Sequence, residues 1–292
     1  MDLLFNNYMK SSGNGPTWHV DISPAARNVG SYFEETVKTL EYIYNNIDEN
    51  IYVLYSGGMD SEYVCETLSY LKISYTPVII DLGHSYNAHD IKFAKEFCER
   101  KNIKPFIIDI DYEEFVRSGE LLEMATKVNC CSFRMPATMK AILSVDGFVL
   151  TGHDPPYMRN NNGRWQLEEE ETSHSILNFF RNYKAKGCPF VLSYTPEMML
   201  SFLKDPVIEK LAHNGFPGKL GTNSTKVHVF NNNNGAFTMA NRQKYTGYEV
   251  IDKSPIYDHP DIQTLETYRS KWNGCFRVDY DVIVKQLSKE IK

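Results

Sequence analysis

The sequence predicts an α/β protein built on a doubly wound, mainly parallel β-sheet, followed by a mixed α+β C-terminal region. Short apolar runs alternate four times with stretches of helical periodicity between residues 31 and 154. These runs lack polar alternation, as is typical of strands that helices bury on both faces. With 42% hydrophobic and 23% charged residues, the composition is that of a globular chain and excludes a disordered or fibrous protein.

The elements of the expected sheet follow in order. Residues 1–30 are rich in Ser, Asn, Gly and Pro without a clear period, so we expect an extended arm or lid there. A helix is expected from Ser31 to a point between residues 46 and 50, because apolar residues recur there at helical spacing. Strands are expected at 51–55, 77–82, 105–110 and 147–150, and further helices after residue 61 and at 88–101, 112–127 and 135–143.

The pattern beyond residue 154 is weaker and mixed. Residues 155–163 indicate a loop, and the acidic run 168–171 indicates a solvated face. Residues 226–230 and 236–240 flank an Asn-rich turn that ends in Gly235, which predicts a β-hairpin. Helices are expected over 175–183, 196–211, 263–272 and 279–291.

Charge and hydropathy bear on whether the protein binds nucleic acid, spans a membrane or is secreted. The net charge of −6 disfavours a whole-protein electrostatic grip on nucleic acid, although a local basic patch that binds tRNA stays open. No apolar run approaches the ~20 residues that span a bilayer, and the first residues lack the features of a signal peptide. We therefore expect a cytoplasmic protein without a membrane partner, and the sequence leaves self-association open.

The cysteines predict reduced thiols rather than disulfides, since no secretory signal accompanies them. Cys65 and Cys98 lie on apolar helical faces and are expected in the core. No Cys-x-x-Cys pair occurs in the sequence, so a structural zinc site is not expected.

The segment Ser56-Gly57-Gly58-Met59-Asp60-Ser61 carries the clearest functional signal. Its glycines follow the first expected strand, where the backbone can turn tightly and approach a ligand. The next helix presents its first amide groups and the positive end of its dipole to an anion. The alternative interpretation is a plain strand-to-helix turn in which Asp60 or Ser61 caps the helix. Because the loop lies at the strand end where open α/β sheets bind ligands, we favour a phosphate cradle; it is not a Walker loop, since no Gly-Lys-Ser/Thr follows.

The same six residues resemble the SGGxDS loop of the PP-loop ATP pyrophosphatases, also called adenine nucleotide α-hydrolases. The resemblance covers residues 31–154 and implies a Rossmann-like fold of that type. Most members cleave ATP between the α and β phosphates, leave AMP on an acceptor oxygen, and let a nitrogen or sulfur nucleophile displace it. The resemblance therefore implies ATP and Mg²⁺ as cofactors.

Other positions are placed on this resemblance. Ile80-Asp81-Leu82 occupies the place where such proteins hold adenine largely through backbone hydrogen bonds, and Thr151-Gly152-His153-Asp154 resembles the second nucleotide-facing motif, Gly-His, of the tRNA-modifying members. Asp60 and Asp154 are the candidate Mg²⁺ ligands, because Mg²⁺ in phosphate sites takes one or two carboxylates. His153 is a candidate phosphate contact or acid–base group.

A third constellation is Asn129-Cys130-Cys131-Ser132-Phe133-Arg134, which resembles a segment of the sulfonucleotide reductases. The downstream Cys-x-x-Cys of the iron–sulfur branch and the Glu-Cys-Gly-x-His tail of the reductases are both missing, so we expect no cluster. Arg134 stays a candidate for a bidentate phosphate contact. Cys130 or Cys131 could still be a reactive thiol, because a helix N-terminus lowers a thiol pKa. Four later basic residues could close over the pyrophosphate, although a solvated position is the simpler interpretation for each: Lys219, Lys226, Arg242 and Lys244.

These observations predict an AMP-forming ATP pyrophosphatase of ligase or transferase type, with Asp60, Arg134 and His153 as its candidate catalytic residues. The expected division is an arm (1–30), a PP-loop nucleotide-binding domain (31–212) and an acceptor or lid region (213–292). The sequence does not identify the acceptor. Free ammonia or a separate donor protein would supply a nitrogen nucleophile, and a separate donor protein would supply a sulfur nucleophile. The alternatives are a sulfonucleotide reductase relative and a nucleotide-binding module without catalysis.

Overall fold

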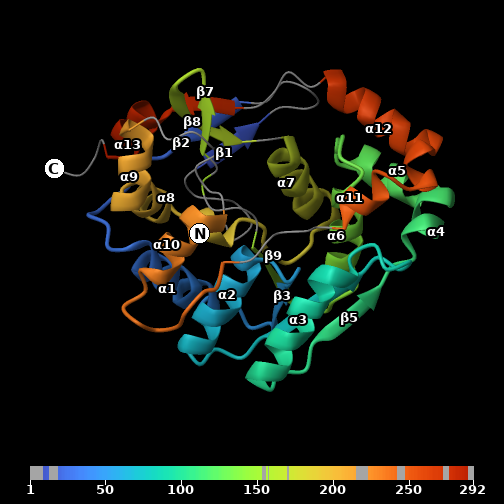
Figure 1. The fold of residues 1–292 in the computed structure, drawn as a ribbon, viewed down its shortest axis with the longest axis horizontal. Coiled ribbons are helices and arrows are strands. Elements are labelled where there is room, and N and C mark those ends of the chain that lie inside the picture. The colour runs from blue at the N-terminus through green and yellow to red at the C-terminus, as the bar shows by residue number, and fades with distance from the viewer. Residues whose placement is uncertain are drawn as a thin grey trace.

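A five-stranded parallel sheet forms the centre of the fold in the computed structural model, which describes residues 9–12, 19–152, 156, 158–169, 171–214, 223–241, 247–271 and 276–288. Its strand order is β5-β4-β3-β6-β9, so the chain winds from the central β3 first toward β5 and then toward β9 (Figure 1). All neighbouring pairs are parallel, which confirms a parallel sheet built on the four expected strands; the fifth strand, β9, was not predicted. The strands are β3 (Ile51–Leu54), β4 (Thr76–Asp81), β5 (Phe106–Asp109), β6 (Phe148–Thr151) and β9 (Gly187–Cys188).

Helices cover both faces of this sheet. Val53 and Leu150 belong to one core, whereas Leu54 and Val149 belong to the other, because successive strand residues point to opposite faces. Apolar residues on both faces explain why the strand sequences lack polar alternation. The first core includes α1 (Tyr32–Tyr44), α2 (Met59–Tyr70) and α3 (Ala88–Lys101); the second includes α4 (Tyr112–Arg117), α5 (Glu120–Lys127), α6 (Met135–Leu143) and α7 (Glu171–Tyr183).

Two expected helices are each divided in the structure. The stretch 112–127 breaks between α4 and α5 at Gly119, whose φ of +78° is a left-handed conformation that ends a helix. The stretch 196–211 breaks between α8 (Pro196–Leu203) and α9 (Pro206–His213). Asp205 caps α9 by accepting a 2.9 Å hydrogen bond from the Val207 N–H, and Pro206 cannot continue the preceding helix.

An antiparallel sheet of order β10-β8-β7 joins the middle of the chain to its C-terminal region. It contains β7 (Met158–Asn161), β8 (Arg164–Glu169) and β10 (Phe276–Asp279). The loop expected at 155–163 is therefore partly wrong. Asn162 and Gly163, both at positive φ, form the tight turn between β7 and β8.

Glu168 is not on a solvated face, contrary to the expectation for the acidic run. Its carboxylate is buried and accepts hydrogen bonds from Arg159 Nη1 at 3.1 Å and Arg277 Nε at 2.9 Å. Two cations from the neighbouring strands compensate the buried charge, which a local sequence pattern does not reveal.

The hairpin expected around residues 231–235 is wrong. Residues 226–230 belong to α10 (Asn223–Asn231), and 236–240 form no strand. The buried Asn233 side chain donates to the carbonyls of Phe230 and Phe237 and accepts from the Ala236 N–H. These bonds satisfy the backbone of the turn, so a strand ladder is not needed there.

The remaining C-terminal helices pack on opposite sides of the molecule (Figure 1). α12 (Pro260–Lys271) contacts α5, and α13 (Tyr280–Leu287) contacts α8. Between α10 and α12 lie α11 (Tyr248–Ile251) and a short 3₁₀ helix, Pro255–Asp258; another, Val191–Ser193, precedes α8. No helix in the described part of the chain is both long and apolar enough to cross a membrane.

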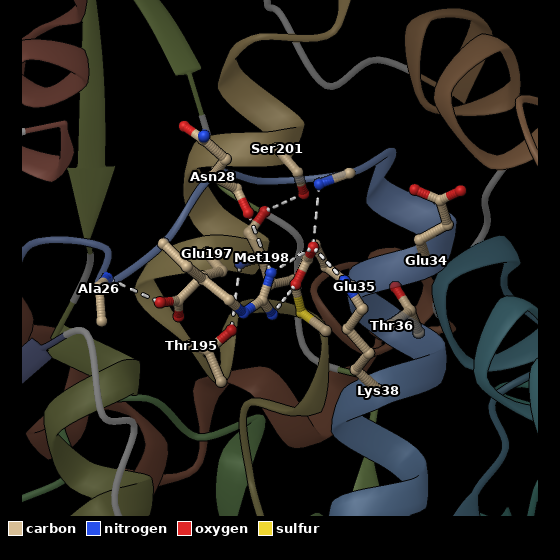
Figure 2. Close-up of polar contacts among 12 residues, drawn as sticks. Ala26, Asn28, Glu34, Glu35, Thr36, Lys38, Thr195, Glu197, Met198 and Ser201 are labelled. Carbon is tan, nitrogen blue, oxygen red and sulfur yellow. Dashed lines mark hydrogen bonds and ion pairs between the residues drawn. The ribbon is translucent and has the colours of Figure 1, made fainter. Parts of the chain in front are cut away.

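The N-terminal segment, residues 9–12 and 19–30 in the described part of the chain, is joined to helix α1 mainly through Glu35. In this segment β1 (Met9–Ser12) pairs antiparallel with β2 (His19–Ile22). The buried Glu35 carboxylate on α1 pairs with Arg27 and Lys38 and accepts from the Gly30 N–H (Figure 2). The Ala26 N–H donates to Glu197 on α8 at 2.8 Å. Residues 26–30 are thus fixed against α1 and α8, while the division of the chain into three regions stays a prediction.

Candidate functional site

The loop at residues 56–61, here called the SGGMDS loop, joins the central strand β3 to α2. Gly57 has a φ of +78°, and a Cβ there would lie 2.2 Å from the Asp90 carbonyl oxygen of α3. Gly58 is the N-cap of α2 and is extended, with a φ of −80°. The first glycine therefore serves the turn and its packing against α3, and the second begins the helix.

The two serines of the loop hold its backbone in place. Ser56 Oγ accepts from the Gly58 N–H at 3.3 Å, and Ser61 Oγ donates to the Gly58 carbonyl at 3.1 Å. The two hydroxyl oxygens are 3.4 Å apart. Neither Asp60 nor Ser61 is the N-cap, so the capping interpretation of these residues is wrong. Helix starts leave amide groups without an intrahelical acceptor, which makes this turn suited to an anion.

The second expected nucleotide motif meets the SGGMDS loop directly. A Cβ at Gly152 would lie 2.7 Å from Ser61 Cα and 2.8 Å from Ser61 N. Thr151, at the end of β6, is buried and donates its hydroxyl to the Pro189 carbonyl. Gly152 thus lets the end of β6 approach the first turn of α2. His153 and Asp154, expected as an acid–base group and a metal ligand, lie outside the described residues.

A lysine from α10 reaches the SGGMDS loop. Lys226 Nζ lies 2.9 Å from Asp60 Oδ2, and the two side chains are only 7% and 13% exposed. The expected solvated position is therefore wrong for Lys226. Lys219, Arg242 and Lys244 lie outside the described residues. The arrangement places a cation beside the helix N-terminus, where the field of the backbone is also positive.

Aromatic stacking positions Lys226. The Phe230 ring, one helical turn beyond Lys226, stacks on Tyr63 with centroids 4.1 Å apart. Tyr63 lies one turn beyond Asp60 on α2. The charged pair Lys226–Asp60 and the aromatic pair Phe230–Tyr63 are therefore one helical turn apart on both helices. The Tyr32 ring lies nearly parallel to both aromatic rings, with its centroid 5.9 Å from that of Tyr63 and 6.2 Å from that of Phe230. Burial, and then the neighbouring Tyr63 and Asp60, raise the pKa of Tyr32, whose neutral hydroxyl donates to the Leu192 carbonyl.

The expected adenine edge, Ile80-Asp81-Leu82, carries a side chain of the protein. Asn87 Nδ2 donates to the Ile80 carbonyl at 2.7 Å, and Asn87 Oδ1 accepts from the Leu82 N–H at 3.1 Å. Asp81 Oδ1 accepts from the Gly83 N–H at 2.9 Å. The backbone groups that the resemblance assigns to a base are therefore already hydrogen-bonded.

Arg134 has an acidic protein partner. Its Nη2 lies 2.7 Å from Asp252 Oδ2, next to α11, and its guanidinium lies over the rings of Phe133 and Tyr248. Tyr248 also donates its hydroxyl to the Arg134 carbonyl at 2.7 Å. A phosphate bound by Arg134 would therefore share the guanidinium with the Asp252 carboxylate.

The cysteines are interior thiols in the described part of the chain. Cys65, Cys98, Cys130, Cys131 and Cys188 are buried, as expected for Cys65 and Cys98. Burial raises the pKa of the Cys98 thiol to about 11. Cys130 Sγ accepts from the Ser132 N–H at 3.4 Å. Among the residues that the structure describes, no three His, Cys, Asp or Glu side chains gather as a metal site would require.

Sequence reasoning missed the roles of Asn87, Asp252 and the buried Lys226. Asn87 precedes a predicted helix, where its type indicates an N-cap rather than a contact with the preceding strand. Lys226 and Asp60 are separated by 166 residues, and Arg134 and Asp252 by 118, so no local pattern connects them. A scan against protein-family models finds no match to this chain, and a search of the curated proteins finds none either.

Proposed function

We propose that this chain is an AMP-forming ATP pyrophosphatase, with the triphosphate bound at the SGGMDS loop and AMP transferred to an acceptor. Its parallel sheet would then be a Rossmann-like sheet of the adenine nucleotide α-hydrolase type. The strand order supports this, because the winding reverses beside β3, and ligands of open α/β sheets bind at such a reversal. The loop follows β3 at this reversal.

The observation that carries the proposal is the convergence of three segments on the first turn of α2. The SGGMDS loop supplies hydroxyl groups and the helix N-terminus, Gly152 closes against Ser61, and Lys226 adds a buried ammonium group. Positive charge at a helix N-terminus is the arrangement that binds phosphate groups. The pair with Asp60 would hold Lys226 in place until a polyphosphate accepts its hydrogen bond.

The residues at the loop act by binding and orienting the polyphosphate. Lys226 and the amides at the start of α2 would stabilise the negative charge that develops on the departing pyrophosphate. Asp60 is the described carboxylate at the loop that could contribute to a Mg²⁺ site, which usually needs only one or two carboxylates besides phosphate and water. Bound Mg²⁺ would supply further neutralisation of phosphate charge.

The proposal is tested with ATP labelled at its α phosphate, incubated with the full chain, Mg²⁺ and a small-molecule extract as the source of acceptors. Chromatography should show AMP, with pyrophosphate as the other product. Lys226→Met should lower this turnover by at least about 100-fold, the magnitude typical of a lost transition-state contact. Lys101→Met is the matched control, since Lys101 also pairs with a buried carboxylate of α2, Glu66, but at its far side from the loop.

Each other outcome points to a different function. Release of ADP instead of AMP would contradict cleavage between the α and β phosphates. Calorimetric binding of ATP without turnover under all acceptor conditions would support a nucleotide-binding module without catalysis. Mass spectrometry of small molecules that co-purify with the chain would identify candidate acceptors for the same assay.

A further inference from the structure

The side chain of Asn87 occupies the backbone edge at the end of β4 that no described strand pairs with. β4 pairs with β3 as far as the 2.8 Å bond from the Tyr55 N–H to the Val78 carbonyl, after which β3 turns into the SGGMDS loop. Because backbone groups alternate along a strand, the Ile80 carbonyl and the Leu82 N–H point to this same side. The Asp81 carbonyl points the other way and accepts from the N–H of Ile110, the residue that follows β5. The Asn87 carboxamide therefore covers the two groups that face the loop.

Asn87 bonds to the strand instead of capping the helix that it precedes. It is the N-cap of the 14-residue helix α3, and asparagine is among the preferred capping residues, yet its side chain makes no capping hydrogen bond. Both of its polar atoms are instead directed to β4, at 2.7 and 3.1 Å. The side chain is thus engaged with the strand edge at the expense of the helix start.

The loop that carries Asn87 has an unusual backbone. Gly83, His84 and Ser85 all have positive φ, at 70°, 47° and 58°. Consecutive non-glycine residues rarely adopt this conformation, which costs energy and persists where the surroundings impose it.

We propose that Asn87 is a displaceable plug on a base-reading edge, which an adenine base replaces on binding. The Watson–Crick edge of adenine carries an amino donor beside a ring-nitrogen acceptor, the same pair that a carboxamide presents. Adenine can therefore take over both hydrogen bonds, to Ile80 and to Leu82, while Asn87 is released to cap α3 or to contact water. Asn87 is then a specificity-determining residue for the nucleotide. This inference rests on the proposed binding of ATP and adds a competitor within the chain.

The test compares the affinities of wild type and Asn87→Ala for ATP, ITP and tripolyphosphate by calorimetry. ATP should bind about ten-fold more tightly to Asn87→Ala, because two modest hydrogen bonds no longer have to be broken. ITP presents the reversed donor and acceptor, and tripolyphosphate presents no base, so their affinities should not change. Asn46→Ala is the matched control, since its carboxamide bonds the Tyr42 carbonyl at the end of α1. Asn87→Ser, which can still cap α3, replaces the alanine variant if that variant does not fold.

Three results separate this inference from the proposed function. Normal tripolyphosphate binding with unchanged or weaker ATP binding by Asn87→Ala would overturn the plug and leave the phosphate site standing. An equal gain for ITP would also overturn it, because the competition would not depend on the base. Failure of both proteins to bind tripolyphosphate and ATP would instead overturn the proposed function, and the plug with it.

Discussion

Lys226 Nζ lies 2.9 Å from Asp60 Oδ2, although 166 residues separate them in the chain. Both side chains are largely withdrawn from water, so each charge depends on the other for compensation. Stacking of Phe230 on Tyr63 holds the two helices in the register that creates this pair. The pair joins a helix of the C-terminal region to the SGGMDS loop, and it relates the stability of the protein to its proposed phosphate site.

Removal of one charge from this pair should destabilise the protein more than removal of both. Lys226→Met and Asp60→Asn should each lower the free energy of unfolding by about 3 kcal/mol, because each leaves a charge without its buried partner. The double variant should lose less stability than either single variant, because it leaves no buried charge without a partner. Urea denaturation of the three variants measures this coupling, and additive losses would show that the two side chains do not interact in solution.

Asp60→Asn should also lower the production of AMP by orders of magnitude at saturating Mg²⁺. Asparagine keeps the shape of the side chain but removes the charge that would hold Lys226 and contribute to a metal site. Turnover is measured under conditions in which circular dichroism shows the variant to be folded. Comparable AMP production by wild type and variant would count against a role for the Asp60 charge.

The two glycines of the loop should respond differently to substitution. Gly57→Ala should cost ~2 kcal/mol or more of stability, because the left-handed φ is unfavourable for alanine and its Cβ would meet the Asp90 carbonyl at 2.2 Å. Gly58→Ala should cost less than about 1 kcal/mol, since its backbone is extended and its nearest new contact is Ser56 Oγ at 3.1 Å.

Gly58→Ala should nevertheless weaken ATP binding, because its Cβ would stand where phosphate approaches the helix start. Thermal denaturation and calorimetry on the same samples separate the two effects. Unchanged ATP affinity in the folded Gly58→Ala variant would contradict the phosphate cradle.

Glu35 should make the stability of the protein depend on acid pH. Burial raises the pKa of this carboxyl, but hydrogen bonds from Arg27, Gly30 and Lys38 outweigh it, and the folded-state pKa is lowered from 4.5. The ionised group thus stabilises the fold above the unfolded-state pKa, and this contribution is lost as the pH falls through the folded-state pKa. Wild type should therefore lose more stability between pH 7 and pH 3 than Glu35→Gln does.

Urea denaturation midpoints across this pH range provide the measurement. Glu123→Gln is the matched control. Glu123 makes an exposed ion pair with Lys127, also on α5, so this substitution should change the pH dependence of stability little. Equal acid sensitivity of wild type and Glu35→Gln would show that the anchor of the N-terminal segment lies elsewhere.

Local sequence patterns were sufficient for the parallel sheet and for the position of the SGGMDS loop. The apolar runs at 51–55 and 147–150 correspond to β3 and β6, and helices α3 and α6 have the expected bounds. Such patterns succeed because burial on two faces and helical periodicity are properties of consecutive residues. The hairpin prediction at 226–240 was wrong because a local pattern can be ambiguous. Its Asn-rich turn fits the end of a helix as well as it fits the turn of a hairpin.

The sequence by itself determined which residues form the central strands and which glycines and serines lie at the turn between β3 and α2. Only the tertiary structure decided that Lys226 neutralises Asp60, that Asp252 neutralises Arg134 and that Glu168 is buried between two arginines. Burial of a charge is favourable only when another segment supplies its partner, and in these pairs the partner lies on a different strand, helix or loop. Which charged side chains are paired at the candidate site therefore depends on segments that folding brings together from distant parts of the sequence, and no local pattern shows it.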